Sequence, residues 1–315
     1  MRKAIFIIPY FGKFNNYFQL FLNSCKYNKD YDWLIFTDDK TKFEYPKNVT
    51  IKYISFKEMR EYILSKFNDI EKIRLERPYK LCDYKPMYGY IFDKYISNYD
   101  YWGFCDIDLI FGKINQFIDL EKLKDFDRIG FLGHFSLFKN TEEINTMFMR
   151  TSQFRNVLES DKSFKFDEEF SKSINNILLD RNKKIFEKEY YADIYVKSSN
   201  FKITHYDINK NNYNVDKKDK SFFVWQQGNL YKIKKCGDKY QKKEYLYIHL
   251  QKRKMKVKNI DNENYKIIPN SFEDLEKDFY NSNYKKIKRK NFNLHYFYIR
   301  GKNLKKKLLD KIKGE

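Results

Sequence analysis

Short apolar runs alternate with amphipathic segments in the first part of the chain. Ala4–Ile8, Trp33–Phe36 and Val49–Ile54 are typical of buried strands, and each is followed by a polar or loop-forming segment. Asn15–Lys26 and Phe56–Phe67 carry apolar residues at helical spacing. Because strands that alternate with helices are typical of parallel sheets, we predict an α/β fold with a mostly parallel sheet and helices on both faces.

A later apolar run, Tyr99–Gly112, is interrupted by Asp106 and Asp108. We interpret it as a buried strand that ends in an acidic pair. Because successive side chains of a strand point to opposite faces, both aspartates would point the same way, with Ile107 turned toward the core. Two carboxylates on one side can hold Mg²⁺ or Mn²⁺ together with substrate phosphates. The alternative is a solvated acidic turn.

The loops after the first strands carry further candidates for ligand binding. In parallel sheets, ligands bind at the carboxyl ends of the strands. The loop Pro9–Lys13, which contains Tyr10, would there meet Thr37, Asp38 and the acidic pair. We therefore expect one binding edge formed by these loops.

Pro78–Ile96 has the pattern of a helix pair or a kinked helix, with an apolar stripe that we assign to the core. Lys80, Asp83 and Lys85 lie near its start, where lysines and helix amide groups favour an anion. Solvated surface charge is the alternative for these three residues.

Two segments after the acidic pair carry further candidate residues. Ile129–Phe138 reads as one or two strands split by Gly133, and the neighbouring His134 could either line a cleft or be structural. Asp167, Glu168 and Glu169 cluster farther along the chain. One of these carboxylates could be a general base, although an exposed acidic helix start gives the same pattern.

The last third of the chain combines a polar segment with a short strand. Lys197–Lys220 is rich in Asn, Lys and Asp, and we expect a mobile loop or lid. Tyr245–Leu250 is strand-like and carries His249, just before a basic run that contains Lys252. A neutral imidazole could complete a cation site, and the basic run could neutralise a pyrophosphate. His249 could also be structural.

Charge adds a preference for anionic partners. The 315 residues carry a formal net charge of +20, and residues 251–315 contain 19 Lys and Arg against 8 Asp and Glu. Such a surface attracts nucleic acid, anionic lipids or phosphorylated ligands, and charge alone does not choose among them. No stretch approaches the roughly 20 apolar residues of a membrane-spanning helix. The four cysteines lack close metal-ligand spacing, which favours free thiols in a reducing compartment.

The basic tail shows a helical pattern. Leu304, Leu308, Leu309 and Ile312 share one helical face opposite several lysines. This pattern is typical of a helix that lies on an anionic membrane. A surface helix packed on the protein through its leucines is the alternative.

Several segments together resemble a bacterial family of capsule and O-antigen glycosyltransferases with the GT-A fold, over roughly residues 1–255. They are IIPYFGK (7–13), YKLCDYKPMYGYIF (79–92), YWGFCDIDLIFG (101–112), GHFSLFKN (133–140) and HLQKRKM (249–255). The resemblance implies a GT-A-like, Rossmann-type domain over residues 1–255. The basic, mainly helical residues 256–315 would then be an extension and a possible membrane-surface anchor.

The resemblance also implies roles for the candidate residues. Asp106, Asp108 and His249 would hold Mn²⁺ or Mg²⁺ against the diphosphate of a UDP-sugar. Lys80 and Asp83 resemble residues that contact the phosphate and sugar of the donor, and Thr37 and Asp38 fall where the nucleoside is held. Pro9 and Tyr10, in the loop after the first strand, and Lys252, in the basic run, are the other residues that we expect to contact the donor. No clear Glu-Asp base motif of inverting relatives follows the metal pair, so Asp167, Glu168 and Glu169 are the candidates if the enzyme inverts.

We therefore expect a metal-dependent hexosyltransferase of surface polysaccharide synthesis. Its donor would be of the UDP-galactose, UDP-galactofuranose or UDP-glucose type, and its acceptor a lipid-linked oligosaccharide. It would be cytoplasmic and peripheral on the inner face of the bacterial cell membrane. The alternatives are another nucleotide-dependent transferase, such as a phospho- or nucleotidyltransferase, and a non-catalytic protein that binds nucleic acid. We do not expect the protein to bind nucleic acid, because its aromatic residues have the spacing of core residues.

Overall fold

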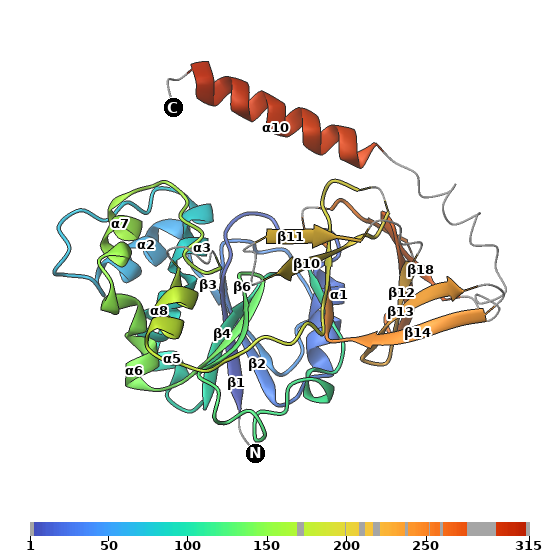
Figure 1. The fold of residues 1–315 in the computed structure, drawn as a ribbon, viewed down its shortest axis with the longest axis horizontal. Helices are drawn as coiled ribbons and strands as arrows, with labels where there is room; N and C mark the ends of the chain where they lie inside the picture. The colour runs from blue at the N-terminus through green and yellow to red at the C-terminus, as the bar shows by residue number, and fades with distance from the viewer. Residues whose placement is uncertain are drawn as a thin grey trace. The chain divides into compact units, whose positions relative to one another are not determined.

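The protein is a mixed α/β structure made of two compact units, each assembled from separate parts of the chain (Figure 1). The computed structural model describes residues 3–168, 173–198, 200–207, 212–216, 221–236, 239–251, 253–258, 261–275 and 294–312. The first unit comprises Met1–Phe14, Asn28–Ile107 and Asn115–Glu189. The second comprises Asn15–Tyr27, Asp108–Ile114 and Tyr190–Glu315. This division differs from the single boundary at residue 255 that the sequence suggests.

A seven-stranded mixed sheet organises the first unit, in the order β3-β2-β1-β4-β7-β6-β8. Strands β3, β2, β1 and β4 are parallel neighbours, whereas β7 is antiparallel to both β4 and β6. Strands β6 and β8 are also parallel, so β7 alone runs against the other six described strands, and this sheet is mostly parallel, as predicted. The strands are β1 (Ala4–Pro9), β2 (Tyr31–Thr37), β3 (Val49–Tyr53), β4 (Tyr101–Cys105), β6 (Arg128–Leu132), β7 (Phe135–Lys139) and β8 (Ile185–Phe186).

The described helices of the first unit pack on one face of this sheet. Alternation along β1 turns Ile5 and Ile7 into the cluster that the helices share, while Phe6 stacks on Trp33 with 5.5 Å between ring centroids. These helices therefore cover one face of the sheet, and helical cover of the other face stays a prediction. The helices are α2 (Phe56–Leu64), α3 (Leu81–Tyr84), α4 (Tyr88–Ile91), α5 (Asp93–Ile96), α6 (Glu142–Asn145), α7 (Gln153–Glu159) and α8 (Ile174–Asp180).

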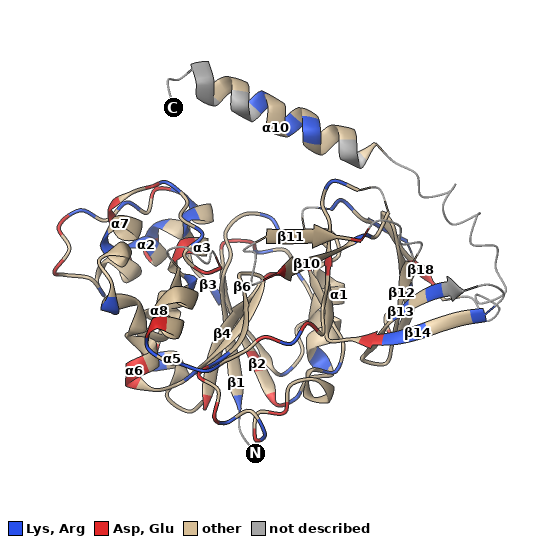
Figure 2. Cartoon of the chain, in the orientation of Figure 1, with Lys and Arg blue, Asp and Glu red and all other residues tan. Residues whose placement is uncertain are grey.

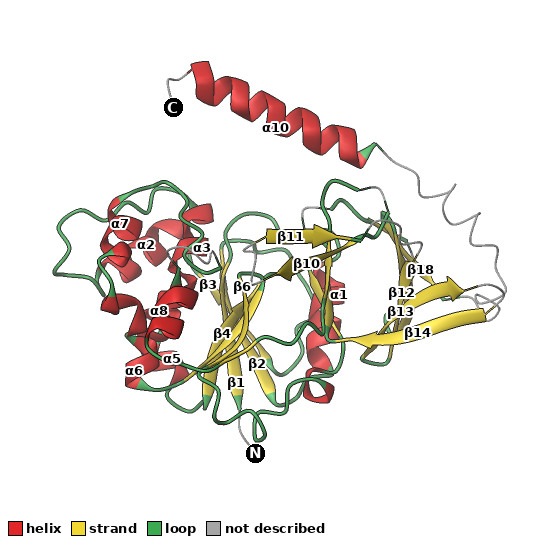
Figure 3. Ribbon diagram, in the orientation of Figure 1, coloured by secondary structure: helices red, strands yellow, loops and turns green. Residues whose placement is uncertain are grey.

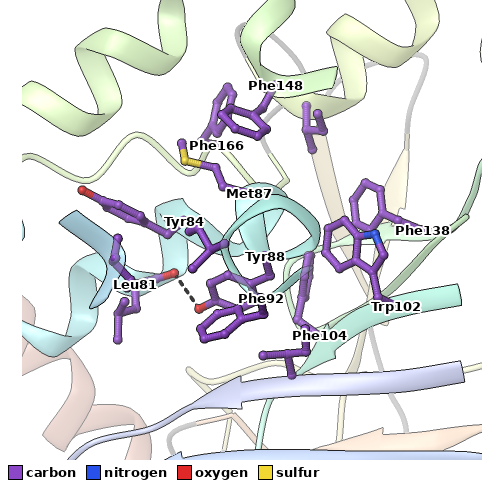
Figure 4. Packing of buried hydrophobic residues seen from close by; sticks show 14 of the residues in the cluster. Leu81, Tyr84, Met87, Tyr88, Phe92, Trp102, Phe104, Phe138, Phe148 and Phe166 are labelled. Atoms are coloured by element: carbon purple, nitrogen blue, oxygen red, sulfur yellow. Dashed lines mark hydrogen bonds between the residues drawn. The ribbon is translucent and has the colours of Figure 1, made fainter. Parts of the chain in front are cut away.

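The segment 78–96 is a chain of short helical pieces around an aromatic core. Turn η1 (Pro78–Lys80) precedes α3, and η2 (Lys85–Met87) separates α3 from α4. Pro86 lies in η2 and has no N–H for a continuous helix. Figure 4 shows Trp102 beside Phe138. Their stacked rings have centroids 4.7 Å apart. Tyr84, Tyr88 and Ile91 of the predicted apolar stripe are buried, so the stripe is core, and the predicted kink lies near the proline.

The second unit contains two further sheets. One has the order β11-β10-β9-β15-β5 and the other β14-β13-β12-β17-β18-β16. Their strands are β5 (Leu109–Phe111), β9 (Ala192–Ile194), β10 (Ile203–Asp207), β11 (Asn212–Val215), β12 (Ser221–Gln226), β13 (Asn229–Cys236), β14 (Lys239–Tyr245), β15 (Tyr247–His249), β16 (Lys256–Val257), β17 (Asn264–Ile268) and β18 (Ser271–Asp274).

Two predictions for this region need correction. The expected mobile loop at residues 197–220 contains the antiparallel pair β10–β11, which buries Ile203 and brings Tyr206 against Tyr213. The expected mainly helical extension from residue 256 begins with strands, since β17 pairs with β12. Polar residues within these strands, such as the buried Lys266 and Glu273, whose charged atoms lie 3.8 Å apart, masked the strand pattern in the sequence.

The described residues of the second unit form two helices, and Figure 3 shows both. Helix α1 (Phe18–Lys26) packs on β5, where the Ser24 hydroxyl accepts a hydrogen bond from the Phe111 amide at 3.1 Å. Helix α10 (His295–Ile312) confirms the predicted helix in the basic tail. Among the described residues, none of the helices combines the length and the apolar character that crossing a membrane requires.

Candidate functional site

The carboxyl ends of β1, β2 and β4 lie side by side, as predicted, because these strands are parallel neighbours. Pro9 ends β1, and the Tyr10 amide donates to the Phe36 carbonyl at 2.8 Å. The Gly12 amide donates to the exposed Asp38 carboxylate at 2.8 Å. The loop after β1 and the end of β2 therefore form one edge in the first unit.

Asp39 anchors this edge, although the sequence did not single it out. Its buried carboxylate accepts from Lys13 Nζ at 2.8 Å and from the Phe14 amide at 2.9 Å. Its own amide donates to the Thr37 hydroxyl at 3.1 Å. Burial acts to raise the pKa of Asp39, but these hydrogen bonds and that from Thr41 outweigh it and hold the pKa well below its usual range. Thr37 is thus buried, and Asp38 is the exposed polar group here.

Lys85 joins two of the predicted acidic residues in the first unit. Its ammonium donates to Asp106 Oδ1 at 2.8 Å and to the Gly133 carbonyl at 2.7 Å, and it lies 3.8 Å from Asp167 Oδ2. Burial acts to lower the pKa of Lys85, but the charges around it, chiefly the Asp106 carboxylate, raise it well above its usual value. Lys85 therefore carries a charge at neutral pH and neutralises part of this acidic cluster.

Asp167, one of the three candidate bases, has a buried carboxylate with a raised pKa. Its burial raises its pKa to about 7; the nearby Lys85 charge opposes this rise, whereas Glu168 adds to it. The Gly133 amide donates to Glu168 Oε2 at 3.1 Å. A Cβ atom at Gly133 would lie 2.4 Å from Asp167 Oδ2, so only glycine leaves room for this carboxylate. Glu169 lies outside the described residues.

Arg128 supports the segment that carries Asp167. This fully buried side chain donates to the Asp167 carbonyl at 3.0 Å and to the Ser136 hydroxyl at 2.9 Å. Burial lowers its pKa to about 9, so it stays charged at neutral pH. Because the guanidinium bonds to the backbone carbonyl of residue 167, it supports the position of Asp167.

Lys80 and Asp83 form a buried ion pair at 3.0 Å instead of facing solvent. Lys80 also donates to the Lys162 carbonyl at 2.6 Å, and Asp83 accepts from the amides of Phe164 and Phe166. These bonds use the charged atoms to hold the segment 162–166. The structure therefore favours a structural role for both residues over the predicted contact with donor phosphate.

His249 lies between two carboxylates in the second unit. Its Nδ1 is 2.7 Å from Asp193 Oδ1, and its Nε2 is 3.3 Å from Asp108 Oδ1. The three residues meet because β15 pairs with β9 on one side and with β5, which follows Asp108, on the other. Gln251 Nε2 donates to the same Asp193 oxygen at 2.7 Å. Asp193 therefore orients the imidazole so that Nε2 faces Asp108.

The two members of the acidic pair have different surroundings. Strand β4 ends at Cys105 and residues 107–108 form a turn, so the pair lies just past the strand; Ile107 is buried, as predicted. Asp106 belongs to the first unit, in the segment that ends at Ile107. Asp108 belongs to the second unit, in the segment Asp108–Ile114. With one residue between them, covalent geometry keeps their Cα atoms within about 7 Å.

The remaining candidates are His134 and Lys252. His134 is buried after β6, and its carbonyl accepts from the Asp106 amide at 3.0 Å. Lys252 lies outside the described residues. Sequence reasoning missed Asp193, because nothing near it in the chain signals a metal site and only strand pairing brings it to His249.

The comparisons with known proteins give a family but no activity. No curated protein matches the sequence. A family model described as "Family of unknown function (DUF6625)" matches residues 6–276, which begin within β1, extend past β18 and include all the described candidate residues. The chain therefore belongs to the DUF6625 family.

Proposed function

We propose that this protein is a metal-dependent glycosyltransferase that moves a sugar from a UDP-sugar to a lipid-linked oligosaccharide. The observation that carries the proposal is the position of His249 between Asp193 and Asp108, the second aspartate of the Asp-x-Asp pair. The parallel strands β3, β2, β1 and β4, with binding residues at their carboxyl ends, support a GT-A-like, Rossmann-type first unit.

The ligand atoms of Asp108 and His249 fit a divalent cation. Two ligand atoms that each lie about 2.1 Å from one ion at near-right angles are about 3 Å apart, and Asp108 Oδ1 lies 3.3 Å from His249 Nε2. The carboxylate behind Nδ1 is the usual partner of a metal-binding histidine. Asp108 and His249 would therefore hold Mn²⁺ or Mg²⁺, and Asp106, tied to Asp108 through Ile107, is the predicted further ligand.

Sugar transfer needs negative charge to be stabilised on the departing diphosphate, and a bound cation would supply that stabilisation as a Lewis acid. The protein's own residues have the other tasks. Tyr10 and Asp38, at the edge formed by β1 and β2, would contact the nucleoside. Lys85 balances part of the charge of Asp106, whose carboxylate it contacts at 2.8 Å.

An inverting reaction also needs a base for the acceptor hydroxyl. Asp167 suits that role because its pKa of about 7 matches a base that works at neutral pH. The Lys85 ammonium at 3.8 Å and the backbone contact from Arg128 position this carboxylate. We therefore propose Asp167, rather than Glu168, as the base.

A panel of UDP-sugars tests the reaction class. We expect UDP release from at least one donor in the presence of Mn²⁺, and loss of that release when a chelator is added. A phospho- or nucleotidyltransferase would instead release diphosphate or transfer phosphate from a nucleoside triphosphate. That result, without UDP release from any donor, would refute the proposal.

Replacing Asp193 with Asn should weaken Mn²⁺ binding and turnover by about 10- to 100-fold, the usual effect of losing a carboxylate behind a metal-binding histidine. Asn can still accept a hydrogen bond, but it no longer stabilises the imidazole by charge. Titration of Mn²⁺ by calorimetry measures the effect. Asp216→Asn is the matched control, because Asp216 pairs with His205 Nε2 at 3.2 Å elsewhere in the second unit. Equal losses in both variants would remove the specific role of Asp193.

A further inference from the structure

We propose that helix α10 binds an anionic membrane surface and lies in the plane of the lipid headgroups. The first observation is its large exposed apolar face. Phe297 is 65% exposed, Leu304 60%, Leu308 54% and Leu309 46%. Phe297, Leu304 and Leu308 are spaced by seven and four residues, which places them on one side of an α-helix. This inference does not depend on the proposed reaction.

The second observation is the charge of the same helix. Arg300, Lys302 and Lys305 are exposed among the apolar residues, and Figure 2 shows blue segments along α10. The helix contains a single acidic residue, Asp310. Apolar side chains combined with lysine and arginine are what an interface of anionic lipids binds, since the acyl region takes the former and the headgroups the latter.

Other partners of α10 would match only one of these two features, the apolar face or the positive charge. Nucleic acid would bind the basic side chains and leave Phe297, Leu304 and Leu308 in water. A second copy of this chain could cover the leucines, but it would bring two basic helices together on molecules with a net charge of +20. An anionic lipid surface accommodates both the apolar face and the charge.

The helix also contacts the segment that follows His249. Lys254 Nζ lies 5.5 Å from the centroid of the Tyr298 ring, within the distance of a cation–π contact. Lys254 comes five residues after His249 in the second unit. Membrane binding through α10 would therefore act on the same unit that carries Asp108 and His249, which suits an acceptor held in a lipid layer.

Binding of the full-length protein to vesicles tests this inference. The vesicles are phosphatidylcholine alone and phosphatidylcholine mixed with phosphatidylglycerol. We expect binding only to the mixed vesicles and weaker binding at high salt. The double variant Leu304→Gln/Leu308→Gln keeps good helix formers and should bind at least about tenfold more weakly, since it removes two apolar anchors.

The matched control is Leu179→Gln in α8. Leu179 is 46% exposed, as Leu309 is, so this variant removes a comparable surface leucine elsewhere. Unchanged binding of the double variant, equal loss in the control, or equal binding to vesicles without phosphatidylglycerol would overturn the proposal. A dimer in solution that the double variant dissociates would assign the face to a second copy instead. UDP release from a soluble donor should be the same in all variants, so failure of the membrane proposal is distinguishable from failure of the proposed reaction.

Discussion

Replacing Asp108 with Asn should lower Mn²⁺-dependent UDP release by on the order of a thousandfold, because a bound cation contributes several kcal/mol of charge stabilisation. Asp108 Oδ1 is the carboxylate atom that lies 3.3 Å from His249 Nε2, and Asn removes its charge with little change in shape. We expect Mn²⁺ affinity, measured by calorimetry, to fall together with turnover.

Asp125→Asn is the control for this substitution, since Asp125 is an exposed aspartate of the first unit. Its turnover and Mn²⁺ affinity should equal those of the unmodified protein. The melting temperature of both variants should also stay close to that of the unmodified protein. If Asp108→Asn retained full metal-dependent turnover, Asp108 would not be a ligand.

Asp167→Asn should reduce turnover by about 10²- to 10⁴-fold if Asp167 is the general base. The pKa of Asp167 is raised to about 7, so the base is protonated and inactive below that pH and ionised above it. Turnover of the unmodified protein should therefore rise with pH through about 7 and then level off. The inflection should disappear in Asp167→Asn. Initial rates of UDP release from pH 5 to 9 measure both effects.

Glu168→Gln separates the base from its neighbour. Glu168 accepts from the Gly133 amide and raises the pKa of Asp167 by its charge. Its neutral replacement should retain turnover and move the inflection to lower pH. A normal rate in Asp167→Asn together with a large loss in Glu168→Gln would transfer the role to Glu168.

The sequence predicted best those elements of the fold that depend on the local pattern of apolar and polar residues. The apolar runs of β1, β2 and β4 are long enough to identify buried strands, and parallel pairing then brings their carboxyl ends to one edge. The segment β10–β11 was missed because its exposed side is polar and its buried side is short. In that segment, packing against the rest of the unit outweighs the local preference for a loop.

The candidate site was predictable only in part, for a physical reason. Asp106, Asp108 and His249 lie near strand ends and interrupt apolar runs, so their types and places are visible in the chain. Asp193 is 56 residues from His249, and only strand register joins them. Lys80 and Asp83 look like surface charges in the sequence, but each is the other's buried partner. Pairing between distant residues is set by the fold, so it could not be read from spacing.

Calorimetric titration of UDP into the protein, with and without Mn²⁺, tests the central claim most directly. If Asp108 and His249 hold the cation that contacts the diphosphate, UDP should bind with Mn²⁺ and lose most of its affinity when Mn²⁺ is removed. Asp108→Asn should bind UDP weakly both with and without Mn²⁺. Equal UDP affinity with and without the metal, or no binding of UDP under either condition, would contradict the account.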